Sequence, residues 1–150
     1  MLEFKITQDL TSPVYADALM IRRRVFIDGQ GVPESLEVDD MEAQARHIVG
    51  YQEGEPVVVA RLIDKELGKT YKVQRVAVLA DWRKHGFGKQ LMLYIEDFAL
   101  EQDVRSLILN AQNTAIGFYE SLDYEIIGDV FLEAGIPHHT MRKTLSDYTL

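Results

Sequence analysis

Apolar and polar positions recur along this chain with two periods, one typical of strands and one typical of helices. Alternation or short apolar runs predict strands at residues 2–7, 47–51, 56–63, 71–79, 106–111, 124–131 and 138–144. Helical spacing predicts a first helix from residue 13, a long helix over residues 87–102 and a shorter helix from residue 113. Helices that flank central strands, with hairpins early in the chain, indicate an α+β domain with a mixed sheet.

Capping residues support this pattern at the ends of the helices. Ser12 and Pro13 are typical of an N-cap and a first helical residue. Gly29, Gly31 and Pro33 predict the end of the first helix and the start of an acidic loop. Asn113 predicts the N-cap of the last helix.

The composition is that of a folded protein and excludes several classes of site. The chain has 150 residues, 47% of them hydrophobic, and a formal net charge of −8. This length predicts one domain over residues 1–150. The absence of cysteine excludes disulfides, thiolate zinc sites and a cysteine nucleophile. The negative charge argues against general binding of nucleic acid. Since neither a membrane span nor a signal peptide is evident, we expect a cytoplasmic protein.

Charge is distributed unevenly along the chain. Residues 28–42 carry six acids and no lysine or arginine, whereas residues 61–89 carry eight basic residues and three acids. This pattern predicts a site for an anionic ligand, with a cationic molecule bound nearby. Alternatively, the acids are solvated or pair internally. The arginines available for such pairing are Arg22, Arg23, Arg24 and Arg46.

The segment over residues 76–89 carries the most specific chemical signal. A valine-rich strand leads through Arg83, Gly86 and Gly88 into the long helix. Glycine allows close approach of the backbone to a ligand, and the first amides of a helix carry the positive end of its dipole. Together with cationic side chains, these features predict a phosphate-binding loop.

Two common phosphate-binding motifs do not fit this loop. Arg83 stands where a Walker loop has its first glycine, and Gln90 stands where it has serine or threonine. Leu91 stands where a dinucleotide-binding fingerprint has its third glycine.

The loop instead resembles the GNAT superfamily of N-acetyltransferases. The run RKHGFG at residues 83–88 is similar to the family signature R/Q-x-x-G-x-G/A, and NTAIGFYE at residues 113–120 is similar to its N-x-x-A-x-x-F-Y-E helix. Further runs resemble the ElaA-like branch of the superfamily: RVFI at 24–27, QGVP at 30–33, EVDD at 37–40, LNAQ at 109–112 and LEAGIPH at 132–138.

The resemblance implies a fold, a co-substrate and a binding site. The fold is a central mixed, mostly antiparallel sheet, flanked by about four helices, with two parallel strands splayed at the cofactor site. The co-substrate is acetyl-CoA, and no metal is expected. Backbone groups of Val76 and Val78 would hold the thioester carbonyl and the pantetheine amides, and amides of residues 83–89 would bind the pyrophosphate. The full set of implied cofactor-binding residues is Val76, Val78, Arg83, Lys84, Gly86, Phe87, Gly88, Lys89 and Asn113.

Tyr119 is the catalytic residue that the resemblance implies. A tyrosine at this helical position in the family protonates the CoA thiolate. A thiol pKa of about 8.5 and a phenol pKa of about 10 make this transfer workable. From the residues alone, a packed aromatic is the simpler interpretation of Tyr119, as a plain N-cap is of Asn113. Gly117, beside these aromatic residues, indicates close approach by a ligand or a strand.

The general base and the acceptor stay open. Some family members have a glutamate where this chain has Lys72, so that base cannot be transferred. The remaining candidates for the base are Glu37, Asp40, His47, His85 and His138. Of these, Glu37, Asp40 and His138 are expected on the acceptor side. The acidic segment predicts a cationic acceptor. The four histidines lack the spacing of metal ligands.

The leading prediction is an acetyl-CoA-dependent N-acetyltransferase that modifies a primary amine of an unidentified acceptor. A non-catalytic acyl-CoA-binding sensor is the alternative, and a phosphate binder unrelated to CoA is a third hypothesis. The expected partners are acetyl-CoA and the amine, with a homodimer left open. Neither nucleic acid nor a membrane is an expected partner.

Overall fold

The computed structural model describes residues 2–145, and backbone contacts divide the chain into two units. The first unit comprises Met1–Ile63 and Arg75–Tyr94, and the second comprises Asp64–Gln74 and Ile95–Leu150. Strand β4 (Thr70–Val78) begins in the second unit and ends in the first, and helix α3 (Phe87–Glu101) begins in the first and ends in the second.

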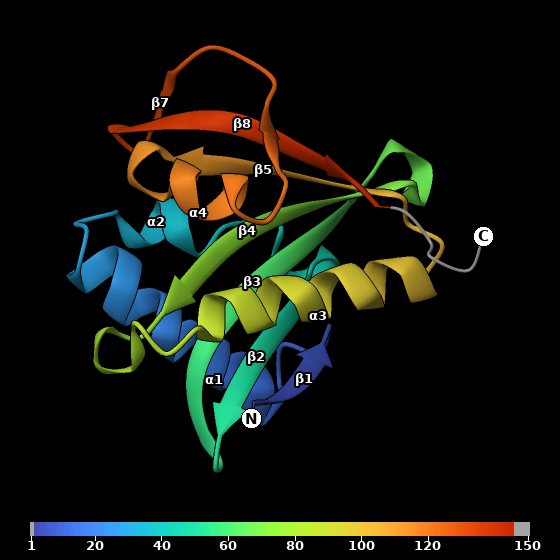
Figure 1. Ribbon diagram of the computed structural model, residues 1–150. Helices are drawn as coiled ribbons and strands as arrows, with labels where there is room; N and C mark the ends of the chain where they lie inside the picture. The colour runs from blue at the N-terminus through green and yellow to red at the C-terminus, as the bar shows by residue number, and fades with distance from the viewer. Residues whose placement is uncertain (1, 146–150) are drawn as a thin grey trace. The chain divides into compact units, whose positions relative to one another are not determined.

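The first unit combines a three-stranded antiparallel arrangement with helices. In it, β1 pairs with β2 and β2 pairs with β3 (Figure 1). Its elements are β1 (Glu3–Thr7), α1 (Pro13–Arg22), a π-helical turn η1 (Arg23–Asp28), α2 (Glu34–Glu37), a 3-10 turn η2 (Glu42–Gln44), β2 (Arg46–Gln52), most of β3 (Glu55–Lys65), the end of β4, a 3-10 turn η4 (Ala80–Trp82) and the first half of α3.

Helix α1 begins where the sequence predicts it. The Ser12 side chain accepts a hydrogen bond from the backbone N–H of Tyr15 at 3.2 Å, and Pro13 occupies the first turn. This satisfies one of the N–H groups that a helix leaves unpaired at its start. Helical winding continues through η1 and stops at Gly29, as expected.

Helices cover both faces of the first unit's strands. On one face, α1 contributes to a buried cluster made of Ala18, Ile21, Val49, Tyr51, Val59 and Ala77. On the other face, Phe4 of β1 stacks on Tyr94 of α3 with ring centroids 4.5 Å apart. Gly50 of β2 belongs to this second face, because a Cβ there would lie 2.9 Å from the Phe4 ring. Successive residues of β2 therefore face opposite helices, as the pleat of a strand requires.

A buried cluster of ion pairs joins the elements of the first unit. We refer to its six residues as the arginine–carboxylate cluster: Arg22, Glu37, Asp39, Glu42, Arg61 and Arg75. Arg22 and Arg61 are 0% and 1% exposed. Three positive and three negative groups balance one another, and such pairing is what makes charge tolerable in a buried place.

Two of the arginines bind a carboxylate through both terminal nitrogens of the guanidinium group. Arg22 binds the two Glu42 oxygens at 2.7 and 2.9 Å. Arg61 binds the two Asp39 oxygens at 2.8 and 3.1 Å and also reaches Glu42 at 2.6 Å. Although burial alone would raise the pKa of Asp39, the hydrogen bond from Arg61 and the neighbouring positive charges lower it to about 2.

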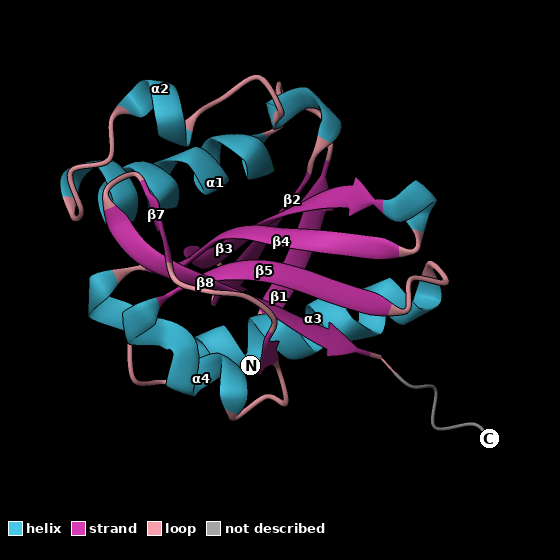
Figure 2. Ribbon diagram, turned by 90° about the horizontal axis from the view of Figure 1, so that it is seen from above, coloured by secondary structure: helices cyan, strands magenta, loops and turns pink. Residues whose placement is uncertain are grey.

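The second unit is built around β5 and β8. Its elements are the end of β3, a 3-10 turn η3 (Glu66–Gly68), the start of β4, the second half of α3, β5 (Ser106–Gln112), a 3-10 turn η5 (Asn113–Ala115), α4 (Ile116–Glu120), β6 (Glu125–Ile126), β7 (Phe131–Glu133) and β8 (Ile136–Thr144) (Figure 2). Strand β5 pairs antiparallel with β8 along its whole length, and β6 and β7 also pair with β8.

Strands β4 and β5 run parallel. Their register pairs Thr70–Val73 with Ser106–Leu109, whereas β4 continues to Val78 and β5 continues to Gln112. Tyr71 of β4 stacks on Phe98 of α3 with ring centroids 6.1 Å apart, so the end of α3 covers this strand.

The predicted fold class is confirmed. The hydrogen-bonded strand order is β1-β2-β3-β4-β5-β8-β6, with β7 also paired to β8. Over residues 2–145 this is a mixed, mostly antiparallel sheet of eight strands with one parallel pair and four α-helices. Within the same residues, no helix has the length and hydropathy to cross a bilayer.

Three local predictions were wrong. The acidic segment contains α2, whose four residues are too short to show a helical period. The strand predicted over residues 124–131 is interrupted between β6 and β7, where Gly128 and Asp129 disfavour extended structure. The last predicted helix is a 3-10 turn followed by the short α4, and Asn113 is the first residue of that turn, not a cap.

The lowered pKa of Asp39 predicts acid sensitivity. Because the folded pKa of about 2 lies below the ordinary value of 3.8, its stabilisation is present above about pH 4 and is lost as the pH falls towards 2. The loss amounts to about 2 kcal/mol in the free energy of unfolding. Denaturant titrations at about pH 5 and about pH 3 should show a smaller pH effect in Asp39→Asn than in the wild type.

Asp103→Asn is the matched control, because its side chain is 90% exposed. It should show the wild-type dependence on pH. If the free energy of unfolding falls equally between about pH 5 and about pH 3 in Asp39→Asn and in the wild type, the assigned ion pairing is wrong.

Candidate active site

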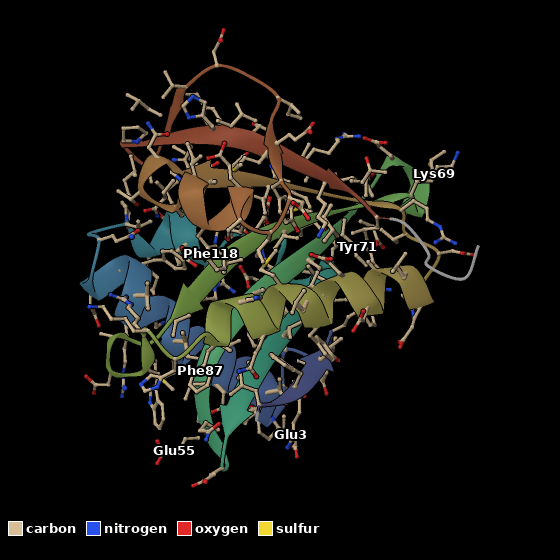
Figure 3. The ribbon with its side chains drawn as sticks, in the orientation of Figure 1. Glu3, Glu55, Lys69, Tyr71, Phe87 and Phe118 are labelled. Atoms are coloured by element: carbon tan, nitrogen blue, oxygen red, sulfur yellow. The ribbon has the colours of Figure 1, made fainter. Side chains whose placement is uncertain are left out.

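The predicted pyrophosphate-binding residues form one continuous turn between β4 and α3 in the first unit. After Val78 the chain passes through η4 and turns at Lys84 and Gly86, whose φ angles are 67° and 77°. Glycine adopts this left-handed conformation without a steric penalty, which explains the residue at position 86. Helix α3 begins at Phe87, directly after the turn (Figure 3).

Aromatic contacts fix the start of α3. The Phe87 side chain is buried and stacks on His85, with ring centroids 5.5 Å apart. The Trp82 ring lies 6.1 Å from Phe87. These rings hold the two sides of the turn together, so that the backbone amides between them have a defined arrangement.

The turn is strongly cationic. Arg83, Lys84 and Lys89 are exposed. The Nε atom of Arg83 donates a hydrogen bond to the Val78 carbonyl at 3.1 Å, which ties the turn to the end of β4. The N-terminus of the 15-residue α3 adds the positive end of its dipole. The arrangement is suited to a phosphate-bearing ligand.

Strand β4 is irregular immediately before Val76. Arg75 has a φ of 58°, in the left-handed region, although its neighbours belong to the strand. Ala77 is buried, whereas Val76 and Val78 are half-buried. The N–H of Leu79 donates to the Val57 carbonyl at 3.0 Å and fixes the strand end to β3.

Tyr119 lies on α4 in the second unit. Its side chain is 7% exposed and meets the rings of Phe118 and Tyr124 edge-on, at 5.0 and 5.7 Å between centroids. Burial raises the pKa of Tyr119, so the phenol is protonated at neutral pH. A protonated phenol on this helix can donate a proton or a hydrogen bond.

Asn113 and Gly117 lie next to Tyr119 in sequence. The Asn113 side-chain oxygen is 2.8 Å from Nδ1 of His139, so this side chain joins η5 to β8. A Cβ at Gly117 would meet nothing within 4 Å, and therefore no strand of the described chain requires glycine there. Asp123, after this helix, has a φ of 73°, a left-handed conformation that aspartate tolerates.

The three expected acceptor-side residues have different surroundings. Glu37 is 3% exposed and belongs to the arginine–carboxylate cluster. Asp40 is exposed. In the second unit, His138 is buried, with Nδ1 2.6 Å from the Ile136 carbonyl and Nε2 3.6 Å from a Glu133 oxygen.

The acidic segment is largely occupied by internal ion pairs. Four of its six carboxylates contact arginines: Glu34, Glu37, Asp39 and Glu42. Arg22 and Arg23 are among the partners, as the internal-pairing alternative predicted. A cationic acceptor therefore finds far fewer available charges here than the sequence indicates.

His47 is unsuited to the role of base. It is 0% exposed, its Nε2 atom lies 2.8 Å from the Glu42 carbonyl, and burial lowers its pKa. Its ring meets Tyr15 edge-on at 4.7 Å, which is the packing of a core histidine. His85 is exposed beside the cationic turn.

Sequence reasoning missed Arg61 and Arg75. Arg61 interrupts the apolar run VVVARLI of β3, and an arginine within such a run signals a buried ion pair. Arg75 carries no comparable signal, because its conformation depends on distant carboxylates. Within residues 2–145, no group of three or more histidine, aspartate or glutamate side chains could hold a metal ion.

Comparison with known proteins shows the family. A model of the acetyltransferase (GNAT) domain matches residues 11–145. The uncharacterised protein YyaT of Bacillus subtilis is 39% identical over 133 residues, which are 87% of this chain and 88% of that protein. ElaA of Escherichia coli is 32% identical over 136 residues, 88% of each protein.

Solved structures share the fold. The crystal structure of Escherichia coli ElaA has a TM-score of 0.81 at 25% identity, over 95% of this chain and 99% of that one. An aminoglycoside 6'-N-acetyltransferase complexed with coenzyme A has a TM-score of 0.74 at 17% identity, over 95% and 98% of the two chains. The chain belongs to the GNAT acetyltransferase family, as the two family motifs predicted, and ElaA is among its relatives, as the further runs predicted.

Substitution of Gly88 tests the cationic turn. Gly88 lies in the first turn of α3, where an acid is favourable for the helix, so Gly88→Asp should fold. Its carboxylate would repel a pyrophosphate, and we expect acetyl-CoA affinity to fall by roughly tenfold or more. Isothermal titration calorimetry measures this change.

Gly128→Asp is the control, because position 128 has open space for a side chain and lies in the other unit. It should bind acetyl-CoA as the wild type does. Unchanged affinity in a folded Gly88→Asp protein would remove the turn from the binding site.

Proposed function

We propose that residues 1–150 form one N-acetyltransferase domain that transfers an acetyl group from acetyl-CoA to a primary amine. The observation that carries this proposal is the cationic turn between β4 and α3, with its left-handed residues at Lys84 and Gly86. It presents the chemistry that a pyrophosphate needs, in a chain that belongs to the GNAT acetyltransferase family.

Acetyl-CoA would be held mainly by backbone groups. The amides of residues 83–89 would bind the pyrophosphate, supported by the side chains of Arg83, Lys84 and Lys89. The pantetheine amides and the thioester carbonyl would bind the backbone of Val76 and Val78. Asn113 would contact the pantetheine arm, and the open space at Gly117 is consistent with approach of the cofactor.

The reaction would be a direct attack on the thioester. The neutral amine adds to the carbonyl carbon, the C–S bond breaks, and the CoA thiolate takes a proton from Tyr119. The nitrogen loses its second proton as the amide forms, and that proton restores the Tyr119 phenol, directly or through water. Burial raises the pKa of Tyr119, but a buried thiolate is destabilised in the same way. Proton transfer depends on the difference between the pKa of the Tyr119 phenol and the pKa of the CoA thiol. Because burial raises both values, this difference is smaller than the shift of Tyr119 alone would suggest.

The amine must lose a proton before it attacks. A lysine-like amine has a pKa of about 10.4, so deprotonation near neutral pH costs roughly 4 kcal/mol. Glu37 would have to leave two guanidinium groups to accept this proton, and His47 is fully buried. Asp40, His85 and His138 remain the candidates for the base or for an ordered water chain.

Tyr119→Phe tests the proposed acid. The change removes only a hydroxyl, so we expect unchanged acetyl-CoA affinity and a fall in kcat of roughly 10²- to 10³-fold. The assay is release of CoA across a library of amines, with the acetylated product identified by mass spectrometry.

Tyr124→Phe is the matched control. Its hydroxyl is buried without a hydrogen-bond partner among the described residues, and its ring touches Tyr119. This variant should retain the wild-type kcat. Equal kcat in Tyr119→Phe and the wild type, with chemistry rate-limiting, would show Tyr119 to be a packing residue, whereas acetyl-CoA binding without turnover on any amine would favour the sensor module.

A further inference from the structure

Arg75 is the one residue of β4 with a positive φ. Its φ of 58° lies in the left-handed region, between the strand residues Gln74 and Val76. A residue with a Cβ populates this region roughly tenfold or more below the right-handed one. An arginine therefore needs a specific restraint to stay there, and a glycine would not.

The restraint is the guanidinium group of the same residue. Its Nε atom lies 3.0 Å from a Glu37 carboxylate oxygen and 3.2 Å from the Glu37 carbonyl. Its Nη2 atom donates to the Leu36 carbonyl at 2.9 Å and to Asp39 at 3.3 Å. All four acceptors belong to residues 36–39, at the end of α2.

Residues 36–39 are themselves held from the opposite side. Arg22 binds the Glu37 carboxylate at 2.9 Å and the Glu37 carbonyl at 2.5 Å. Arg61 binds both oxygens of Asp39. Movement of this segment away from Arg75 would leave buried charges without partners, which is costly. Residues 36–39 are therefore held in place by Arg22 and Arg61, and they in turn hold the side chain of Arg75 in β4.

We propose that Arg75 is a positioning residue for acetyl transfer. Its side chain holds the left-handed turn in β4 and thereby sets the direction of the backbone groups of Val76 and Val78. It also fixes residues 36–39, expected on the acceptor side, relative to that backbone. This inference rests on the proposed function, in which Val76 and Val78 hold the thioester.

A purely structural role would need the ion pairs but not the left-handed backbone. The two roles are separable because glycine and alanine both delete the guanidinium group, yet only glycine adopts a positive φ freely. Arg75→Ala and Arg75→Gly lose the same ion pairs. They differ in how readily position 75 returns to the conformation of the wild type.

The experiment compares kcat, the acetyl-CoA dissociation constant and the unfolding midpoint of both variants. We expect both to lose stability, and we expect Arg75→Gly to have roughly tenfold higher kcat than Arg75→Ala. Free guanidinium ion at low concentration should raise the activity of Arg75→Gly. Arg105→Ala removes an arginine from an exposed pair in the second unit and should leave kcat unchanged.

Arg75→Lys keeps the test valid if the smaller variants do not fold. Lysine retains the charge but cannot reach Leu36, Glu37 and Asp39 together, because it lacks the planar fork. We expect a folded protein with a kcat reduced by roughly tenfold. Wild-type kcat in folded Arg75→Lys, or equal kcat in folded alanine and glycine variants, would overturn the inference.

A readout that is independent of turnover separates this inference from the proposed function. The backbone amide resonances of Val76 and Val78, recorded by NMR without ligand, should shift in Arg75→Ala and return towards the wild type in Arg75→Gly. If the wild type acetylates no amine but these shifts occur, the proposed function fails and the positioning of β4 stands. If the wild type is active and the resonances of Val76 and Val78 do not move, the positioning role is wrong.

Discussion

The pairing of three arginines, two of them fully buried, with three carboxylates is the constraint around which the first unit is built. Arg22 comes from α1, Arg61 from β3 and Arg75 from β4, and their partners lie in the segment that joins α1 to β2. A buried charge without a partner is expensive, so each residue of the cluster restricts where the others can lie. The cluster thereby fixes an otherwise irregular, acidic segment against the strands.

This constraint links the acidic segment to the part of the first unit that we propose binds the cofactor. Through Arg75, the cluster reaches the β4 backbone directly before Val76. Two residues further along β4, the carbonyl of Val78 accepts a hydrogen bond from Arg83 of the cationic turn. Since the cluster is neutral overall, its three carboxylates are neutralised by arginines and do not repel an anionic ligand. An acidic protein with a net charge of −8 can therefore present a strongly cationic turn where α3 begins.

Local signals in the sequence were sufficient for most of the fold and for the turn that leads from β4 into α3. Ser12 and Pro13 marked α1, and the glycine spacing at residues 86–88 marked the start of α3. What failed at the candidate site depended on contacts between distant residues. Glu37 looked available on the acceptor side because sequence does not show that Arg22 and Arg75 surround it. The strand predicted over 124–131 was wrong for a local reason, because Gly128 and Asp129 interrupt it between β6 and β7.

A crystal structure of the protein with bound CoA would test the account most directly. We expect the pyrophosphate on the amides of residues 83–89, the pantetheine arm along Val76 and Val78, and a positive φ at Arg75 with its guanidinium still on residues 36–39. A cofactor bound elsewhere, or a β4 backbone that is extended through position 75 in the complex, would contradict it.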